Sequence, residues 1–182
     1  MKSLSSIRRA LRGAYGEVFH RYPVLGAIAG IAILGQIGTA SINSLSLPFY
    51  ELGSLKLPGR VLGYTASAFL AAETLLKLPF GYMSDHYGRR PFVMAGLLAV
   101  TATPLAILLV PSAALPAAVL LYAVMLPLRL VGGAGSAATW PPLFAAVPDS
   151  VPKQDRGTGM AIINSAYVAG LALGPALAGA DN

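Results

Sequence analysis

Three ionisable side chains stand inside long apolar stretches of this 182-residue sequence: Glu73, Lys77 and Arg129. A charge at the centre of a lipid bilayer costs at least about 2.5–3.5 kcal/mol on insertion scales, so such residues usually mark function. Glu73 and Arg129 lie equally far along the chain from the start of their own apolar stretches, at Val61 and Ala117. This separation is roughly 18 Å at a helical rise of about 1.5 Å per residue. Equal depth predicts a Glu73–Lys77–Arg129 charge cluster along a water-filled path, in which Glu73 takes and releases a proton.

A simpler interpretation of part of this cluster stays open. Lys77 follows Glu73 at the i,i+4 spacing. The two can therefore neutralise each other on one helix face without any function. Polar residues in other apolar stretches have two interpretations as well, because they either line a cavity or join helices by hydrogen bonds. These residues are Gln36, Asn43, Asn164 and Tyr167.

The composition places the chain in a membrane. Hydrophobic residues make up 55% of the chain and charged residues only 11%. A typical soluble domain has roughly 25% charged residues. The chain has no cysteine, and its two histidines, His20 and His86, are isolated. We therefore expect no metal site and no cofactor. No nucleophile–base pair is apparent, which argues against an enzyme.

Five apolar segments predict five transmembrane helices and an all-α, polytopic bundle. The segments cover about residues 24–47, 61–82, 92–110, 117–140 and 158–180. They make up one transmembrane domain, residues 23–182. Residues 1–22 carry five basic side chains and apolar residues at three- and four-residue spacing. This pattern predicts a basic amphipathic cytoplasmic tail, and a frayed tail is the alternative.

The basic residues fall on alternate sides of these segments. Nine lie in the tail and in the connections after the second and fourth segments, and two, Lys56 and Arg60, lie in the first connection. By the positive-inside rule the N-terminus is cytoplasmic and the C-terminus of this chain is outside, in a cell membrane such as the bacterial inner membrane. The net charge of +6 therefore reflects orientation and not nucleic-acid binding.

Three motifs follow one another in the sequence. Residues 81–91 read GYMSDHYGRRP, residues 129–138 read RLVGGAGSAA, and residues 170–179 read GLALGPALAG. The first resembles the cytoplasmic-loop signature of the major facilitator superfamily, G-x-L-S-D-R-x-G-R-R. The second and third resemble the family's fourth-helix motif, R-x-x-Q-G-x-G-A-A, and its fifth-helix antiporter motif, G-x-x-x-G-P-x-x-G-G. Here His86, Gly132 and Ala178 replace the usual residues.

The resemblance implies roles for the matching residues. The first motif implies a cytoplasmic gating loop with Gly81, Asp85, Gly88, Arg89 and Arg90. The fourth-helix motif contributes Arg129, Gly133 and Gly135. The fifth-helix motif contributes Gly170, Gly174, Pro175 and Gly179, and it implies a bend that seals one side of a cavity.

The implied function is secondary active transport of a small organic molecule by alternating access, with proton-coupled efflux as the expected form. A symporter of the same superfamily is an alternative. The family has twelve helices and this chain has five predicted spans, so a truncated, non-transporting remnant or an accessory subunit is another. The expected partners are a small-molecule substrate, protons and the lipid bilayer. A C-terminal half or a second copy of the chain is a further expected partner.

The charge asymmetry gives a test of orientation. A cysteine in place of Ser3 should resist an impermeant thiol reagent in intact cells, and one in place of Ser54 should react. The reverse labelling pattern would contradict the assignment, and the cysteine-free parent chain is the blank.

Overall fold

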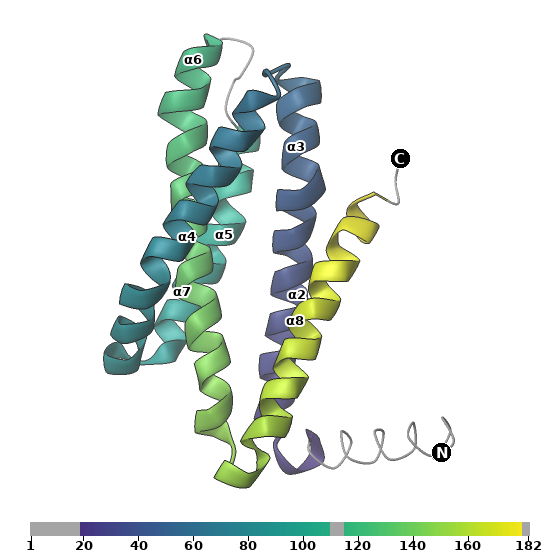
Figure 1. Cartoon of the computed structure of the whole chain (residues 1–182), viewed down its shortest axis with the longest axis vertical. Coiled ribbons are helices and arrows are strands. Elements are labelled where there is room, and N and C mark those ends of the chain that lie inside the picture. The colour runs from purple at the N-terminus through teal and green to yellow at the C-terminus, as the bar shows by residue number, and fades with distance from the viewer. Residues whose placement is uncertain (1–18, 110–114, 180–182) are drawn as a thin grey trace.

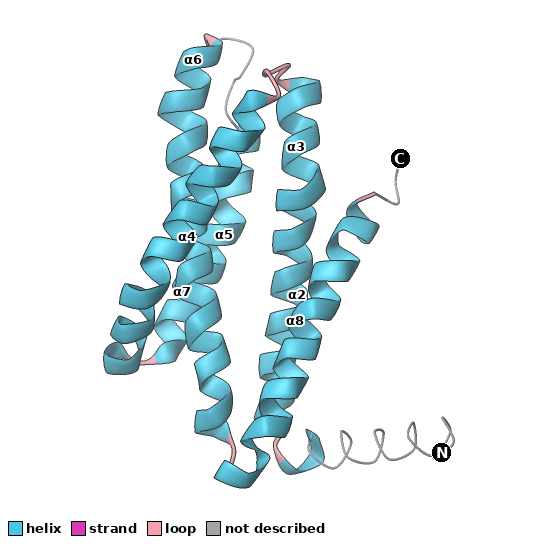
Figure 2. Ribbon diagram, viewed as in Figure 1, coloured by secondary structure: helices cyan, strands magenta, loops and turns pink. Residues whose placement is uncertain are grey.

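The computed structural model describes residues 19–109 and 115–179. Within these ranges the chain is helical with short connections and no strand (Figure 2). The predicted tail, residues 1–22, falls almost entirely outside them. Five helices are long and apolar enough to cross a membrane. Their bounds are Pro23–Ser54, Arg60–Tyr87, Arg89–Leu109, Leu120–Ser150 and Lys153–Ala178.

Some of the long helices are built from shorter stretches. The first consists of α2 (Pro23–Ser41), α3 (Leu47–Phe49) and two π-helical stretches, η1 (Ile42–Ser46) and η2 (Tyr50–Ser54). The next two are the single helices α4 (Arg60–Tyr87) and α5 (Arg89–Leu109). The fourth consists of the π-helical η4 (Leu120–Met125) and α7 (Leu126–Ser150), and the short helix α6 (Ala117–Val119) directly precedes it. A 3₁₀ turn, η5 (Lys153–Asp155), leads into α8 (Arg156–Ala178).

The helices extend beyond three of the apolar segments that predict them. The first continues to Ser54, α4 to Tyr87 and α7 to Ser150. Hydropathy marks where lipid ends, whereas backbone hydrogen bonding continues into polar sequence. The expected loop at residues 81–91 is therefore mostly helix, and Gly88 alone separates α4 from α5. The φ of Gly88 is 94°. Residues that have a side chain rarely adopt a φ in this range, so glycine is the residue that suits this position.

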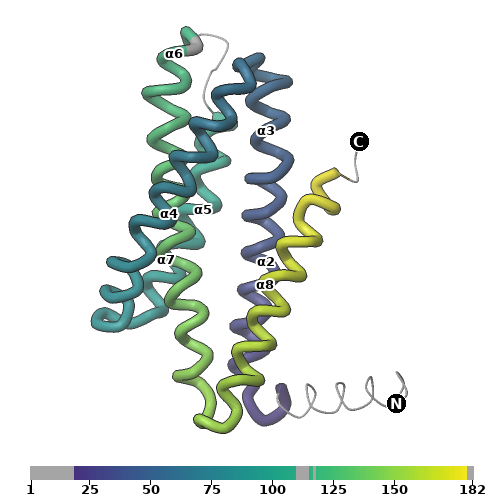
Figure 3. Tube along the Cα trace, in the orientation of Figure 1, coloured from purple at the N-terminus to yellow at the C-terminus, as the bar shows by residue number. Residues whose placement is uncertain are grey.

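The helices run alternately up and down and form two packed groups (Figure 1). In one group α2 packs along α8, and in the other α7 packs along both α4 and α5. The Cα trace in Figure 3 shows the same division, with α2 and α8 beside each other on the right. The connections α4–α5 and α7–α8 lie at the lower end, together with the start of α2. The connection into α4 lies at the upper end.

Glycine makes the close helix contacts. A Cβ on Gly174 would lie 2.7 Å from both Ala40 Cβ and the Ile37 carbonyl oxygen, so α8 approaches the α2 backbone directly. A Cβ on Gly170 would lie 2.6 Å from the Ile33 carbonyl oxygen. In α7, a Cβ on Gly133 would collide with the Phe69 carbonyl oxygen of α4. A Cβ on Gly135 would lie 2.8 Å from Ala99 Cβ of α5. These four motif positions are therefore packing positions.

Two buried apolar clusters lie at the two ends of the bundle. The lower one joins α2, α7 and α8 and contains Leu25, Trp140 and Ile163. The upper one surrounds the connection into α4 and contains Leu57, Val61 and Met125. Along α2 and α7, the residues between these clusters include the buried polar side chains Gln36 and Arg129. On these two helices, buried polar side chains therefore lie between the two apolar clusters.

The glycine contacts predict a selective loss of stability. Gly174→Ala should lower the free energy of unfolding by about 1–3 kcal/mol, because the added methyl group forces α8 away from α2. Gly63→Ala in α4 is the matched control, since nothing lies within 4 Å of its added Cβ. Alanine is the better helix former, so this control should leave stability unchanged or raise it. Unfolding of the purified chain in mixed detergent micelles measures both, and equal effects would contradict the contact.

Candidate functional site

A cavity of about 280 Å³ lies between α2, α4, α7 and α8. Its walls combine polar and aromatic side chains, as is usual for sites that orient a small molecule. The polar residues are Gln36, Thr39, Asn43, Ser44, Glu73, Arg129 and Ser136, and the aromatic ones are Phe69, Trp140 and Tyr167. Three of the four predicted lining residues, Gln36, Asn43 and Tyr167, do line it. Asn164 is exposed and does not.

Arg129 is the most connected charged residue of the cavity, and it is only 8% exposed. Its Nη1 donates to Asn43 Oδ1 at 2.6 Å, and its Nε donates to the Thr65 carbonyl oxygen at 3.2 Å. The guanidinium carbon also lies 4.5 Å from the centre of the Phe69 ring. This separation is a cation–π distance. Arg129 therefore joins α7 to the first helix and to α4.

The local backbone makes these contacts possible. Asn43 lies in the π-helical stretch η1. Such a stretch widens the helical turn locally and is frequent at functional sites. Gly132 and Gly133, just after Arg129, bring α7 against Phe69 of α4. The motif R-x-x-G-G thus combines a cation with the small residues that let its partners approach.

Glu73 has a different partner. Its Oε1 lies 2.9 Å from Lys77 Nζ, the i,i+4 pair that the spacing predicts. No ion pair joins Glu73 to Arg129 among the described residues, so the predicted three-residue cluster is divided into two sets of contacts. Both residues nevertheless line the same cavity. The Glu73 side chain is 15% exposed and that of Lys77 is 47% exposed, so Lys77 is the freer partner.

Two acidic residues, Glu51 and Asp149, make side-chain contacts in the structure but were not singled out from the sequence. Glu51 is the more buried of the two. It is only 1% exposed, and its Oε2 accepts a hydrogen bond from Thr65 Oγ1 at 3.1 Å. Glu51 marks the end of an uncharged run and so resembles a loop residue. The available signal was its spacing from Asn43. Two helical turns separate these residues, which places Glu51 on the continuation of the polar stripe of the first helix.

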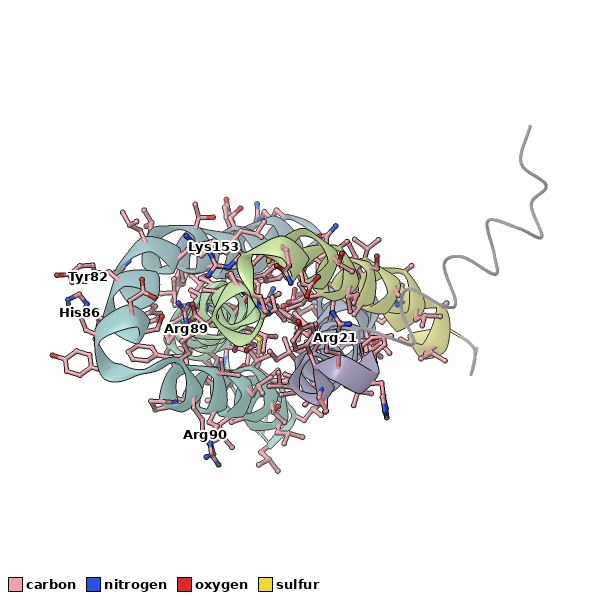
Figure 4. All side chains as sticks on the ribbon, turned by 90° about the horizontal axis from the view of Figure 1, so that it is seen from below. Arg21, Tyr82, His86, Arg89, Arg90 and Lys153 are labelled. Atoms are coloured by element: carbon pink, nitrogen blue, oxygen red, sulfur yellow. The ribbon has the colours of Figure 1, made fainter. Side chains whose placement is uncertain are left out.

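The lower end of the bundle carries the first motif and many of the basic residues (Figure 4). Arg89 Nε donates to Asp149 Oδ2 at 2.7 Å, and Arg89 Nη2 lies 3.2 Å from Asp85 Oδ1. The motif therefore binds the end of α7 as well as its own helix α4, and Asp149 is the second acid that sequence reasoning missed. Arg90 points away from the bundle, as do Tyr82 and His86.

The remaining motif residues differ in their surroundings. A Cβ on Gly81 would lie 3.9 Å from Pro141 of α7, an ordinary contact. A Cβ on Gly179 would meet only the Pro175 carbonyl oxygen of its own chain segment, at 3.4 Å. The helix α8 continues through Pro175 to Ala178, so the motif does not end the helix at the proline.

Five helices able to cross a membrane, with a cavity lined in part by polar side chains, define an all-α, polytopic membrane protein. Comparison with known families places it more narrowly. The model of the Major Facilitator Superfamily matches residues 23–180, so the chain belongs to this family of membrane transporters. No solved structure matches the chain.

The network around Arg129 predicts energetic coupling. Arg129→Gln and Glu51→Gln should be non-additive, with an interaction energy of about 0.5–3 kcal/mol, because both change the environment of Thr65. The interaction energy is obtained from the free energies of unfolding of the wild-type chain, the two single variants and the double variant. The measurements are made at alkaline pH so that Glu51 carries its charge. Asp85→Asn is the control partner, since it lies near the opposite end of α4 from Thr65 and should add independently. Additive effects for Glu51 would contradict the network.

Proposed function

We propose that the chain is the substrate-binding part of a secondary transporter that exports a small organic molecule in exchange for protons. The observation that carries this proposal is a carboxylate, Glu73, in the wall of a cavity at membrane depth. Its cation, Lys77, is half-exposed and can leave it. Proton uptake by Glu73 would break this pair and change the charge of the cavity by one unit.

Aromatic residues support an organic substrate. The Trp140 and Tyr167 rings meet edge to face with centroids 4.9 Å apart, and Phe69 lies under Arg129 in the same cavity wall. Rigid aromatic walls suit a flat organic molecule, and the neighbouring charges suit an ionisable one. Alternating access would then require the cavity to open in turn at each end of the bundle.

The proposed orientation puts the lower end of the bundle in the cytoplasm of a cell whose plasma membrane contains the protein. Arg21, Arg89, Arg90 and Lys153 lie at this end (Figure 4), while Lys56 and Arg60 belong to the opposite end. Under this orientation the Arg89–Asp149 and Arg89–Asp85 pairs hold the cytoplasmic ends of α4, α5 and α7 together. We propose that they stabilise the state closed to the cytoplasm.

A second candidate is an accessory subunit that acts only with another membrane protein. One face of α4 is open to either partner, because Leu75 and Leu78 are 75% and 82% exposed and Tyr82 continues the row. A further helical bundle covering this face would complete either a transporter or a complex.

Glu73→Gln tests the proton role. Vesicles from cells that express the protein from its natural gene are loaded with ethidium, and a pH gradient is then imposed. The substitution should abolish gradient-driven ethidium movement but leave its binding intact, since it removes only the titrating group. Lys77→Gln is the matched neighbour and should weaken transport less.

Unchanged gradient-driven transport in Glu73→Gln would contradict the proton role. No gradient-driven transport by the wild-type protein, with ethidium binding retained, would favour the accessory subunit.

A further inference from the structure

Glu51 is the most deeply buried charged residue in the described part of the chain, and the proposed function does not use it. Its Oε1 is buried and has no hydrogen-bond partner among the described residues, and its Oε2 meets only the Thr65 hydroxyl. A carboxylate anion buried with one lone hydrogen bond is costly, whereas a protonated carboxyl is much less so. A carboxyl group in such surroundings is a candidate for binding and releasing a proton.

The charged groups near this end of the bundle are few. Arg129 of α7 reaches Thr65 from the cavity side. Lys56 of the connection and Arg60 of α4 are exposed, and so is Tyr64 of α4. Tyr50, on the same helix as Glu51, packs against the upper apolar cluster. Among these, Arg129 is the buried cation, and Thr65 separates it from Glu51.

Thr65 has two acceptors within reach of one hydroxyl proton. Its Oγ1 lies 3.1 Å from Glu51 Oε2 and 3.2 Å from the Leu62 carbonyl oxygen. When Glu51 is ionised, the hydroxyl donates to the carboxylate. When Glu51 carries a proton, the acid O–H can donate to Thr65 Oγ1, and the hydroxyl turns to Leu62. One proton is bound, no covalent bond other than O–H forms, and every donor keeps an acceptor.

Thr65 also connects the protonation state of Glu51 to the cavity. The Thr65 carbonyl oxygen accepts from Arg129 Nε, and Arg129 Nη1 holds Asn43 in the cavity wall. Ionised Glu51 balances the charge of Arg129, and protonated Glu51 leaves that charge to the cavity. The two residues of the first helix involved, Asn43 and Glu51, both lie in its π-helical stretches. Such stretches are common at functional sites.

We propose that Glu51 and Thr65 form a proton-binding site, separate from Glu73, whose occupancy sets the charge that Arg129 presents to the cavity. The proposal deepens the proposed proton coupling, but its test needs no transport. The test measures the fluorescence of Trp140, the chain's one tryptophan, which lines the cavity together with Arg129.

The experiment is a pH titration, in lipid nanodiscs, of the purified wild-type chain and of the chain carrying Glu73→Gln, which removes the other carboxyl of the cavity. The expected outcomes are those in the Glu73→Gln background. Tryptophan fluorescence should change along a single-proton curve, and infrared difference spectra should show a carboxyl group gaining its proton over the same range. Glu51→Gln, which mimics the protonated acid, should abolish both changes and fix the fluorescence at its acidic value. Asp155→Asn in the same background is the control and should leave the curve in place, because Asp155 lies at the lower end of the bundle, where it accepts a hydrogen bond from Tyr22.

Thr65→Val provides a second, independent test, because it keeps the side-chain shape and removes the hydroxyl. Both protonation states lose their hydrogen bond to Thr65, but the bond to the anion is the stronger one, so the midpoint should move to higher pH. The difference between a charged and a neutral hydrogen bond is about 1 kcal/mol, which corresponds to about a fivefold rise in proton affinity.

Each contrary result has a distinct meaning. A titration that persists in Glu51→Gln, or an unshifted midpoint in Thr65→Val, would overturn the proposal and leave Glu51 a fixed structural residue. A curve present in the wild-type chain but absent once Glu73→Gln is introduced would overturn it while supporting the proton role of Glu73. Should Glu51→Gln fail to fold, the Thr65→Val midpoint decides alone.

Discussion

The structure depends on keeping a guanidinium ion in the middle of a membrane. The charge of the buried Arg129 guanidinium must be met by hydrogen bonds and by a nearby anion. The partners come from the first helix and α4: Asn43, Thr65 and, through Thr65, Glu51. This requirement draws the first helix, α4 and α7 together around one point. The π-helical stretches and the paired glycines that follow Arg129 are the local adjustments that meet it.

The same requirement explains the polarity of the cavity. Apolar clusters at both ends exclude water and lipid, and the polar side chains between them share a limited number of partners. The two carboxylates of this region, Glu73 and Glu51, have different partners. Glu73 is paired with a half-exposed lysine on its own helix, and Glu51 has a hydroxyl. Two acids with such unlike surroundings are suited to different tasks.

Much of the fold could be predicted from the sequence, because membrane-spanning helices leave a strong hydropathy signal. The five apolar segments, the residues inside them and the Glu73–Lys77 pair follow from hydropathy and helical spacing. The partners of Arg129 could not be predicted in this way, since equal depth does not say which helices are neighbours. Glu51 and Asp149 were missed because each stands at the edge of an apolar segment, where a charge looks like a loop. Glycines four residues apart in a membrane helix favour close helix packing, but only some of those in this chain are so used. Gly170 and Gly174 pack closely, whereas Gly30, Gly59 and Gly63 face open space.

The single residue between α4 and α5 also limits how the protein can be altered. Gly88 needs a positive φ, and Arg89, directly after it, is bonded to both α4 and α7. A tag, a fluorophore or an epitope placed there would separate Arg89 from Asp85 and remove the backbone geometry of the turn. The connection at residues 55–59 has several exposed residues, and its backbone hydrogen bonds reach only the helices that it joins. Leu57 of this connection is buried in the upper apolar cluster, and Lys56 has a positive φ. Insertions for labelling or for crystallisation chaperones therefore belong between the exposed residues Pro58 and Gly59, and the lower turn should be left at its native length.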